Sequence, residues 1–160
     1  MGSAFERLAA TLDYPLYVVT TALQSEPTGC LIGFATQCSI HPPRFLACIS
    51  KKNHTLLPAR RAACVAVHIV EEQDKKIAEL FGGETGDEVD KFERCEWHEG
   101  PQGVPIVEAC RNWFAGEILD RLDLGDHTGY LLSPIAAERG EPVDQFSFHR
   151  ARRIDPGHEA

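Results

Sequence analysis

Short apolar segments alternate with polar ones along this chain of 160 residues, and many of them are rich in β-branched and aromatic side chains. Segments of this kind, bounded by glycine, proline and aspartate, are typical of β-strands. We predict a hairpin loop at residues 24–28 and a turn at Pro42-Pro43, because proline cannot donate to a sheet ladder. The predicted strands cover residues 16–21, 29–35, 45–49, 64–70, 104–109, 113–124 and 130–137.

Helical spacing is confined to short segments. Two helices are predicted at residues 55–62 and 74–81, and a shorter one near residues 88–92 within an acidic, irregular stretch. The polar residues from about 138 onward are predicted to form a C-terminal tail. A further helix near the N-terminus begins behind Ser3, a suitable N-cap, and carries apolar residues at helical spacing, namely Phe5, Leu8, Ala9 and Leu12.

The succession of strands with only short helices between them predicts one domain over residues 1–160. We expect a mainly β fold, a closed antiparallel barrel with short α insertions, rather than a doubly wound sheet. A chain of this length buries roughly 70% of its unfolded surface and needs no disulfides to stabilise its core. Its net charge of −8 and pI of 5.3 argue against nucleic acids and acidic membranes as general partners.

The sequence shows neither the patterns of membrane or secreted proteins nor those of common metal sites. No stretch approaches the ~18 apolar residues of a membrane span, and Met1-Gly2-Ser3 leads into an amphipathic segment rather than a signal peptide. The histidines lack H-x-x-x-H and H-E-x-x-H spacing, so we predict no metal site. We expect a cytoplasmic protein with reduced core cysteines, although a metal or redox role for one cysteine remains an alternative; they are Cys30, Cys38, Cys48, Cys64, Cys95 and Cys110.

Three segments carry candidate chemistry. Residues 50–55 combine two lysines, hydroxyl and amide side chains, and a predicted helix start, which suits a terminal phosphate or carboxylate. The alternative is a solvated turn in which Thr55 only caps the helix. Gly29 and Gly33 would let a flat ligand approach the backbone closely, unless Gly33 only marks a bend of the barrel. His127 lies at a strand entry, where it either titrates near a ligand or simply caps the strand.

Taken in order, these segments resemble the flavin reductase-like family with the FMN-binding split barrel. The resemblance covers about nine-tenths of the chain, and the ordered set of motifs is more specific than any one of them. The motifs are Tyr14-Pro15 with Val18-Val19-Thr20-Thr21, Gly29 through Pro42-Pro43, Cys48-Ile49-Ser50-Lys51-Lys52-Asn53-His54-Thr55, Gly103-Val104-Pro105-Ile106-Val107, Gly125-Asp126-His127-Thr128 and Phe148-His149-Arg150.

The resemblance implies an antiparallel Greek-key split barrel and an NAD(P)H-dependent flavin reductase. Such an enzyme transfers hydride from NADH or NADPH to FMN, or to FAD, and supplies a monooxygenase or another acceptor. It also implies a homodimer with flavin near the interface. Candidate contacts there, unless they pack in the core instead, are Trp97, Trp113 and Phe114. The alternatives are a flavoredoxin-like FMN electron carrier without its own NAD(P)H activity, a split barrel that binds haem or a deazaflavin, and an interaction module that has lost its cofactor.

The resemblance also implies roles for single residues. His127 would lie near the reactive face of the flavin ring, and Gln37 near the ring edge. The family has Thr-Ala-Asn-Ser where this chain has residues 31–34, so backbone groups would have to replace the lost side-chain donors there. Phosphate binding is implied for Ser50, Lys51, Lys52, Asn53 and Thr55, and further cofactor contacts for Leu31, Ile32, Gly33, Phe34 and His149.

Overall fold

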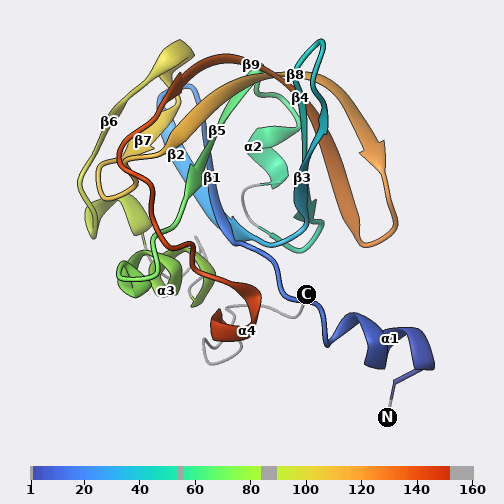
Figure 1. The fold of residues 1–160 in the computed structure, drawn as a ribbon. Helices are drawn as coiled ribbons and strands as arrows, with labels where there is room; N and C mark the ends of the chain where they lie inside the picture. The colour runs from blue at the N-terminus through green and yellow to red at the C-terminus, as the bar shows by residue number, and fades with distance from the viewer. Residues whose placement is uncertain (1, 54–55, 84–89, 152–160) are drawn as a thin grey trace.

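A seven-stranded antiparallel sheet, in the order β2-β1-β5-β8-β9-β4-β3, forms the body of the molecule (Figure 1). The computed structural model describes residues 2–53, 56–83 and 90–151. A second, two-stranded sheet pairs β6 with β7. The strands are β1 (Tyr17–Leu23), β2 (Glu26–Ile32), β3 (Ala35–Ser39), β4 (Arg44–Ser50), β5 (Cys64–Ile69), β6 (Trp97–Glu99), β7 (Pro105–Val107), β8 (Trp113–Asp123) and β9 (His127–Glu138).

The helices are short and lie around this sheet. In Figure 1, α2 lies inside the ring of strands, whereas α1 stands away from the barrel. The predicted N-cap of α1 is confirmed, because Ser3 and Glu6 form a capping box. The helices are α1 (Ala4–Ala9), α2 (Leu56–Ala59), α3 (Lys75–Gly83) and α4 (Phe148–Ala151), with 3₁₀ turns η1 (Lys91–Glu93) and η2 (Pro101–Gly103).

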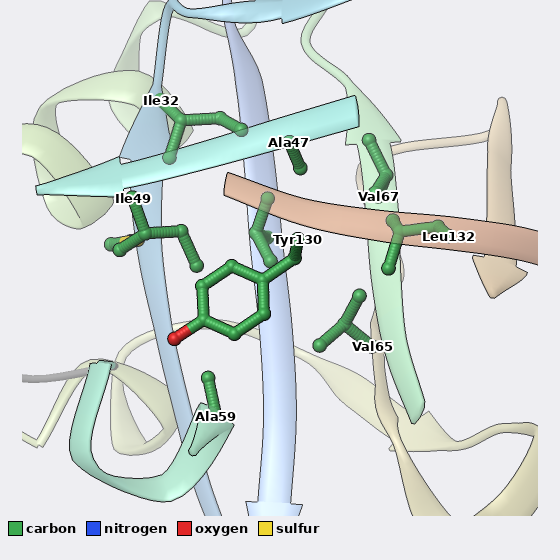
Figure 2. Packing of buried hydrophobic residues seen from close by; sticks show 10 residues of the cluster. Ile32, Ala47, Ile49, Ala59, Val65, Val67, Tyr130 and Leu132 are labelled. Atoms are coloured by element: carbon green, nitrogen blue, oxygen red, sulfur yellow. The ribbon is translucent and has the colours of Figure 1, made fainter. Parts of the chain in front are cut away.

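The sheet curls into a barrel around one apolar cluster. Side chains from β1, β2, β4, β5 and β9 meet Ala59 of α2 in this cluster, which closes one end of the barrel. Figure 2 shows the Tyr130 ring at its centre, pointing toward Ala59. The chain passes from β4 to β5 across the strands β8 and β9 that separate them, which is the crossing connection of a Greek key. The predicted antiparallel barrel is therefore confirmed.

Two predicted boundaries near the N-terminus are wrong, one of a hairpin loop and one of a strand. The hairpin loop is a two-residue turn of Gln24 and Ser25, both with positive φ (53° and 67°), instead of residues 24–28. The predicted strand 29–35 is broken at Gly33 and Phe34, where the chain leaves β1 as its partner and joins β4. A change of partner depends on distant strands, so the local pattern did not reveal it.

The polar tail packs more closely than its composition suggested. Phe146 is 2% exposed; its N–H donates to the Val70 carbonyl, and its own carbonyl accepts from Leu16. The Phe148 ring stacks on Tyr14 at 4.8 Å. Strand β6 was not predicted, and β7 is shorter than residues 104–109. Of the helix predicted near residues 88–92, residues 88 and 89 lie outside the described residues, and the rest overlaps the 3₁₀ turn η1.

Candidate functional site

The loop after β4 lies against the turn between β8 and β9. Ser50 pairs with His127 in the β4–β9 ladder, and the Lys51 N–H donates to the Asp126 carbonyl at 2.9 Å. The Lys51 Nζ lies 2.7 Å from Asp123 Oδ1. Pairing between these distant segments brings the predicted phosphate loop and the predicted catalytic histidine together. We call residues 50–53 and 123–127 together the loop–hairpin corner.

His127 is held by its neighbour in the sequence. Its Nδ1 lies 2.7 Å from Asp126 Oδ1, and its side chain is 17% exposed. In the neutral ring this hydrogen bond places the proton on Nδ1, which leaves Nε2 as an acceptor. The Phe34 ring lies 5.0 Å from the imidazole, so His127 and Phe34 share one edge of the site.

An apolar surface extends from this corner over the outside of the barrel. Because Ala47, Ile49 and their partners point into the core, the alternate side chains of β4 and β9 face outward. Leu46 pairs with Leu131, and Cys48 pairs with Gly129. We call this surface the outer face, and its members are Phe34, Leu46, Cys48, Leu122, Leu124 and Leu131.

The outer face is open enough to receive a flat ring. Phe34 is 54% exposed and Leu124 is 52% exposed. A β-carbon added at Gly129 would lie 2.8 Å from Leu124 and 3.2 Å from Leu46, so these two leucines lean over the glycine. Exposed apolar side chains beside a cationic loop suit a ligand with an aromatic ring and an anionic tail.

Two carboxylates balance the charge of the corner. The Lys51 hydrogen bond, together with the Gly125 N–H, lowers the pKa of Asp123. The hydrogen bond from His127 lowers the pKa of Asp126. An incoming phosphate must therefore compete with Asp123 for the Lys51 ammonium.

Gly29, on β2, and Gly33, just after it, both lie against protein side chains. A β-carbon at Gly33 would lie 2.6 Å from the Tyr14 ring, and one at Gly29 would lie 2.9 Å from the Phe81 ring. Protein side chains fill both spaces. Close packing explains both glycines, and close approach of a flat ligand to the backbone there stays a prediction.

The remaining residues of the predicted site are more scattered. Ile32 points into the barrel core, and Leu31 packs with the cluster around α3. Gln37 lies on β3, where its side-chain amide donates to the Ser39 carbonyl. Asn53 donates its N–H to the Ser50 carbonyl.

Lys52 is exposed next to Lys51 in the corner. Thr55 lies outside the described residues. His149 is on α4, where its N–H donates to Asp13 and its buried Nε2 has no hydrogen-bond partner among the described residues. A row of rings, Phe148, Tyr14 and Phe34, lies between His149 and His127, so the structure does not bring the two histidines into contact.

Several members of the site were missed in the sequence. Cys48 precedes Ser50 by two residues, and its N–H donates to the Phe34 carbonyl at 2.9 Å. Strand alternation would have placed Cys48 on the same face as Ser50. Asp123 and Asp126 carried no such signal, because their role depends on how the β8–β9 hairpin folds back over β4.

The structure offers little for metal binding or membrane crossing. Within residues 2–53, 56–83 and 90–151, no cluster of three His, Cys, Asp or Glu side chains is arranged to hold a metal ion. All six cysteines are free. Among the described helices, none is long and apolar enough to cross a membrane.

Comparison with known proteins agrees with this architecture. The family model described as Flavin reductase like domain matches residues 9–155. The NADH-dependent FAD reductase of Streptomyces globisporus is 30% identical over 154 residues, which are 90% of this chain and 82% of that protein. The flavin reductase domain protein of Arthrobacter sp. FB24 superposes with a TM-score of 0.83 at 20% identity and covers 91% of this chain and 89% of its own; it supports the fold alone.

Some relatives are much longer than this chain. The stachydrine N-demethylase reductase subunit Stc3 of Rhizobium meliloti (strain 1021) is 29% identical over 142 residues, which are 86% of this chain and 60% of the relative. A probable flavin reductase of the same organism is matched over 44% of its length. The chain thus spans about half the length of these two relatives.

Proposed function

This chain belongs to the flavin reductase like domain family, and from that premise we propose that it reduces a flavin with NADH or NADPH. FMN is the favoured flavin because the loop–hairpin corner is suited to a terminal phosphate, and FAD is the alternative. The relative named NADH-dependent FAD reductase supports both the reaction and a nicotinamide reductant.

One observation carries the proposal: an exposed apolar surface extends from a corner that holds both a cation and a histidine. The outer face, with Phe34 at its edge, adjoins Lys51, directly after β4, and His127 at the start of β9. A flavin has the same order of features, since an apolar tricyclic ring is followed by a polar chain and an anionic phosphate. The residues present therefore fit the group.

The proposed roles of the residues follow from their positions. When bound, the flavin supplies the atom that accepts the hydride, so the protein needs no strong base of its own. Lys51 and Ser50 would hold the phosphate, together with the predicted contacts from Lys52, Asn53 and Thr55. His127, oriented by Asp126, would bound the ring face where the nicotinamide docks. Phe34 would wall the same space.

The reduced flavin is proposed to serve a separate monooxygenase. Support comes from relatives whose names describe them as reductase components, including that of 4-hydroxyphenylacetate 3-monooxygenase in Pseudomonas aeruginosa, which is 27% identical over 158 residues.

The exposed apolar outer face supports a homodimer that would cover part of it. An acidic chain with six free cysteines suits the reducing cytoplasm.

The proposal is tested by measuring the oxidation of NADH and of NADPH by the purified protein, with FMN, FAD or riboflavin added. The unaltered chain should oxidise at least one nicotinamide only when flavin is present, and its visible spectrum should change when FMN binds. His127→Ala should slow hydride transfer about tenfold with little change in the Kd for FMN, because the ring bounds the reactive face. His98→Ala is the matched control, since His98 lies on β6 with its own carboxylate partner, Glu108.

Two results would count against the proposal. Bound flavin without any nicotinamide oxidation would favour the flavoredoxin-like carrier. No spectral change with any flavin would remove both functions.

A further inference from the structure

The two ends of the barrel are built differently. At one end α2 closes the core with Ala59, beneath Tyr130 and Ile49 (Figure 2). The other end contains a cavity of about 760 Å³, and none of the described residues that line it belongs to a helix. We call this end the barrel mouth. Its volume falls within the roughly 300–1,000 Å³ of small-molecule sites.

Aromatic rings form the wall of the barrel mouth. Phe45 lies edge-on to Tyr17 at 5.7 Å and edge-on to Phe114 at 5.0 Å. Beneath them the core narrows to small residues, because Ala47 is fully buried and Ala35 packs beside it. A flat apolar group lying in the cavity against these rings would fill volume that the protein's own side chains leave open.

Cations lie at the rim of this apolar cavity. Arg44 and Arg139 both line it, with one carboxylate, Glu138. The Arg44 Nη1 donates to the Pro43 carbonyl and to Ser133 Oγ, which fixes the guanidinium at the rim. Arg139 is exposed, and no ion pair joins it to any of the described residues. In a chain with a net charge of −8, this local excess of positive charge favours an anion.

We propose that the barrel mouth binds a small aromatic carboxylate, with its ring against Tyr17, Phe45 and Phe114 and its carboxylate shared by the two rim arginines, Arg44 and Arg139. Guanidinium groups suit this ligand because they can bind both carboxylate oxygens at once. The carboxylate end of this site lies far from the loop–hairpin corner, although Gln37, an expected flavin contact, also lines the cavity. Arg44 and Ser50 are at opposite ends of β4, about 20 Å apart along the strand, and Phe45 faces the barrel interior.

A tryptophan at the barrel mouth allows ligand binding there to be followed by fluorescence. Trp113 lines the cavity, whereas Trp97, the other tryptophan of the chain, packs against Phe92 in the cluster around α3. In a Trp97→Phe background, fluorescence therefore reports Trp113 alone. The probe is 4-nitrobenzoate, whose nitro group quenches tryptophan, and its neutral analogue is 4-nitrobenzyl alcohol. Isothermal titration calorimetry on the unaltered chain measures the same Kd without any substitution.

The expected result is saturable quenching by 4-nitrobenzoate with a Kd below about 1 mM, equivalent to roughly −4 kcal/mol. The alcohol should bind at least fivefold more weakly. Arg139→Gln and Arg44→Gln should each raise the Kd for the acid at least fivefold and leave the Kd for the alcohol unchanged. Arg7→Gln on α1 is the matched control and should change neither value, because Arg7 lies outside the cavity.

Four outcomes would overturn this inference. They are absence of quenching and of calorimetric heat, equal affinity for acid and alcohol, competition by saturating FMN, and binding that is lost as the protein concentration rises. Competition by FMN would assign the probe to the outer face, and loss at high protein concentration would assign the barrel mouth to a second copy of the chain. A protein that binds FMN but not 4-nitrobenzoate refutes the barrel-mouth proposal and leaves the proposed function intact.

Discussion

His68 and His127 belong to the same barrel but occupy opposite environments. His68 is fully buried on β5, where its Nδ1 lies 2.8 Å from the Val18 carbonyl and its Nε2 accepts from the Val107 N–H at 3.1 Å. His127 lies at the start of β9, and its partner is the exposed carboxylate of Asp126. One histidine therefore joins three strands through the backbone, and the other borders a surface site.

The partners decide what each ring can do. Because the Val107 N–H occupies Nε2, the His68 proton must be on Nδ1, and a second proton would face another donor. Burial lowers the pKa of His68 to about 4, so the ring is neutral at physiological pH. In His127 the Nδ1–H donates to the Asp126 carboxylate and Nε2 is left as an acceptor, so Nε2 can face a ligand. The comparison shows that the surroundings, not the residue type, separate a structural histidine from a candidate functional one.

The largest effect should come from His68→Leu. Leucine has a similar size but removes two buried hydrogen bonds of the ring, the one to the Val18 carbonyl and the one that the Val107 N–H donates, which should reduce the free energy of unfolding by roughly 3 kcal/mol. Urea denaturation followed by circular dichroism measures this loss. His98→Leu is the matched control and should cost less than about 1 kcal/mol, since its pairing with Glu108 is at the surface. Equal losses in both variants would contradict the assigned role of His68.

Acid should weaken the fold through the same ring. The folded protein binds fewer protons than the unfolded chain between pH 6.5, the ordinary pKa of His68, and about 4, so stability falls as the pH falls through this window. The loss should total about 3 kcal/mol. The exposed carboxyls with lowered pKa, Asp13, Asp123 and Asp126, act only at lower pH, because their contribution disappears below 3.8.

The measurement is urea denaturation at several pH values for the unaltered chain and for His68→Leu. The variant should lack the decline between pH 6.5 and 4. Parallel curves for the two proteins would assign the acid sensitivity to other groups.

Lys51→Ala tests the other region of the comparison, the loop–hairpin corner. Loss of a charge-assisted bond to phosphate should weaken FMN binding by ~1.5–3 kcal/mol, or roughly 10- to 100-fold in Kd. Riboflavin, which lacks the phosphate, should bind both proteins alike. Lys75→Ala on α3 is the control, since Lys75 pairs with Glu79 far from the corner in the sequence. An unchanged Kd for FMN would remove this loop from the site.

Asp123→Asn should give the smallest effect and the opposite sign. Removing the carboxylate releases Lys51 from its 2.7 Å ion pair, so FMN should bind a few-fold more tightly. The gain stays below about 1 kcal/mol because the pair is at the surface. Asp120→Asn, on the same strand, should leave the Kd unchanged. Weaker FMN binding in Asp123→Asn would mean that Asp123 orients Lys51 for the phosphate rather than competing with it.

Local patterns were enough to predict the barrel and the lysine loop. The apolar segments at residues 45–49 and 64–70 predicted strands that the structure has as β4 and β5. Ser3 predicted the start of α1. These features depend on neighbours within a few residues, so the amino-acid sequence determines them directly.

Only the tertiary structure decided which of these segments meet. The pairing of Ser50 with His127 puts Lys51 beside Asp123, and the switch of partner at Gly33 turns Phe34 toward His127. The open barrel mouth likewise depends on which end α2 closes. Strand register and barrel closure are set by contacts between residues far apart in the chain, and no periodicity within one segment contains that information.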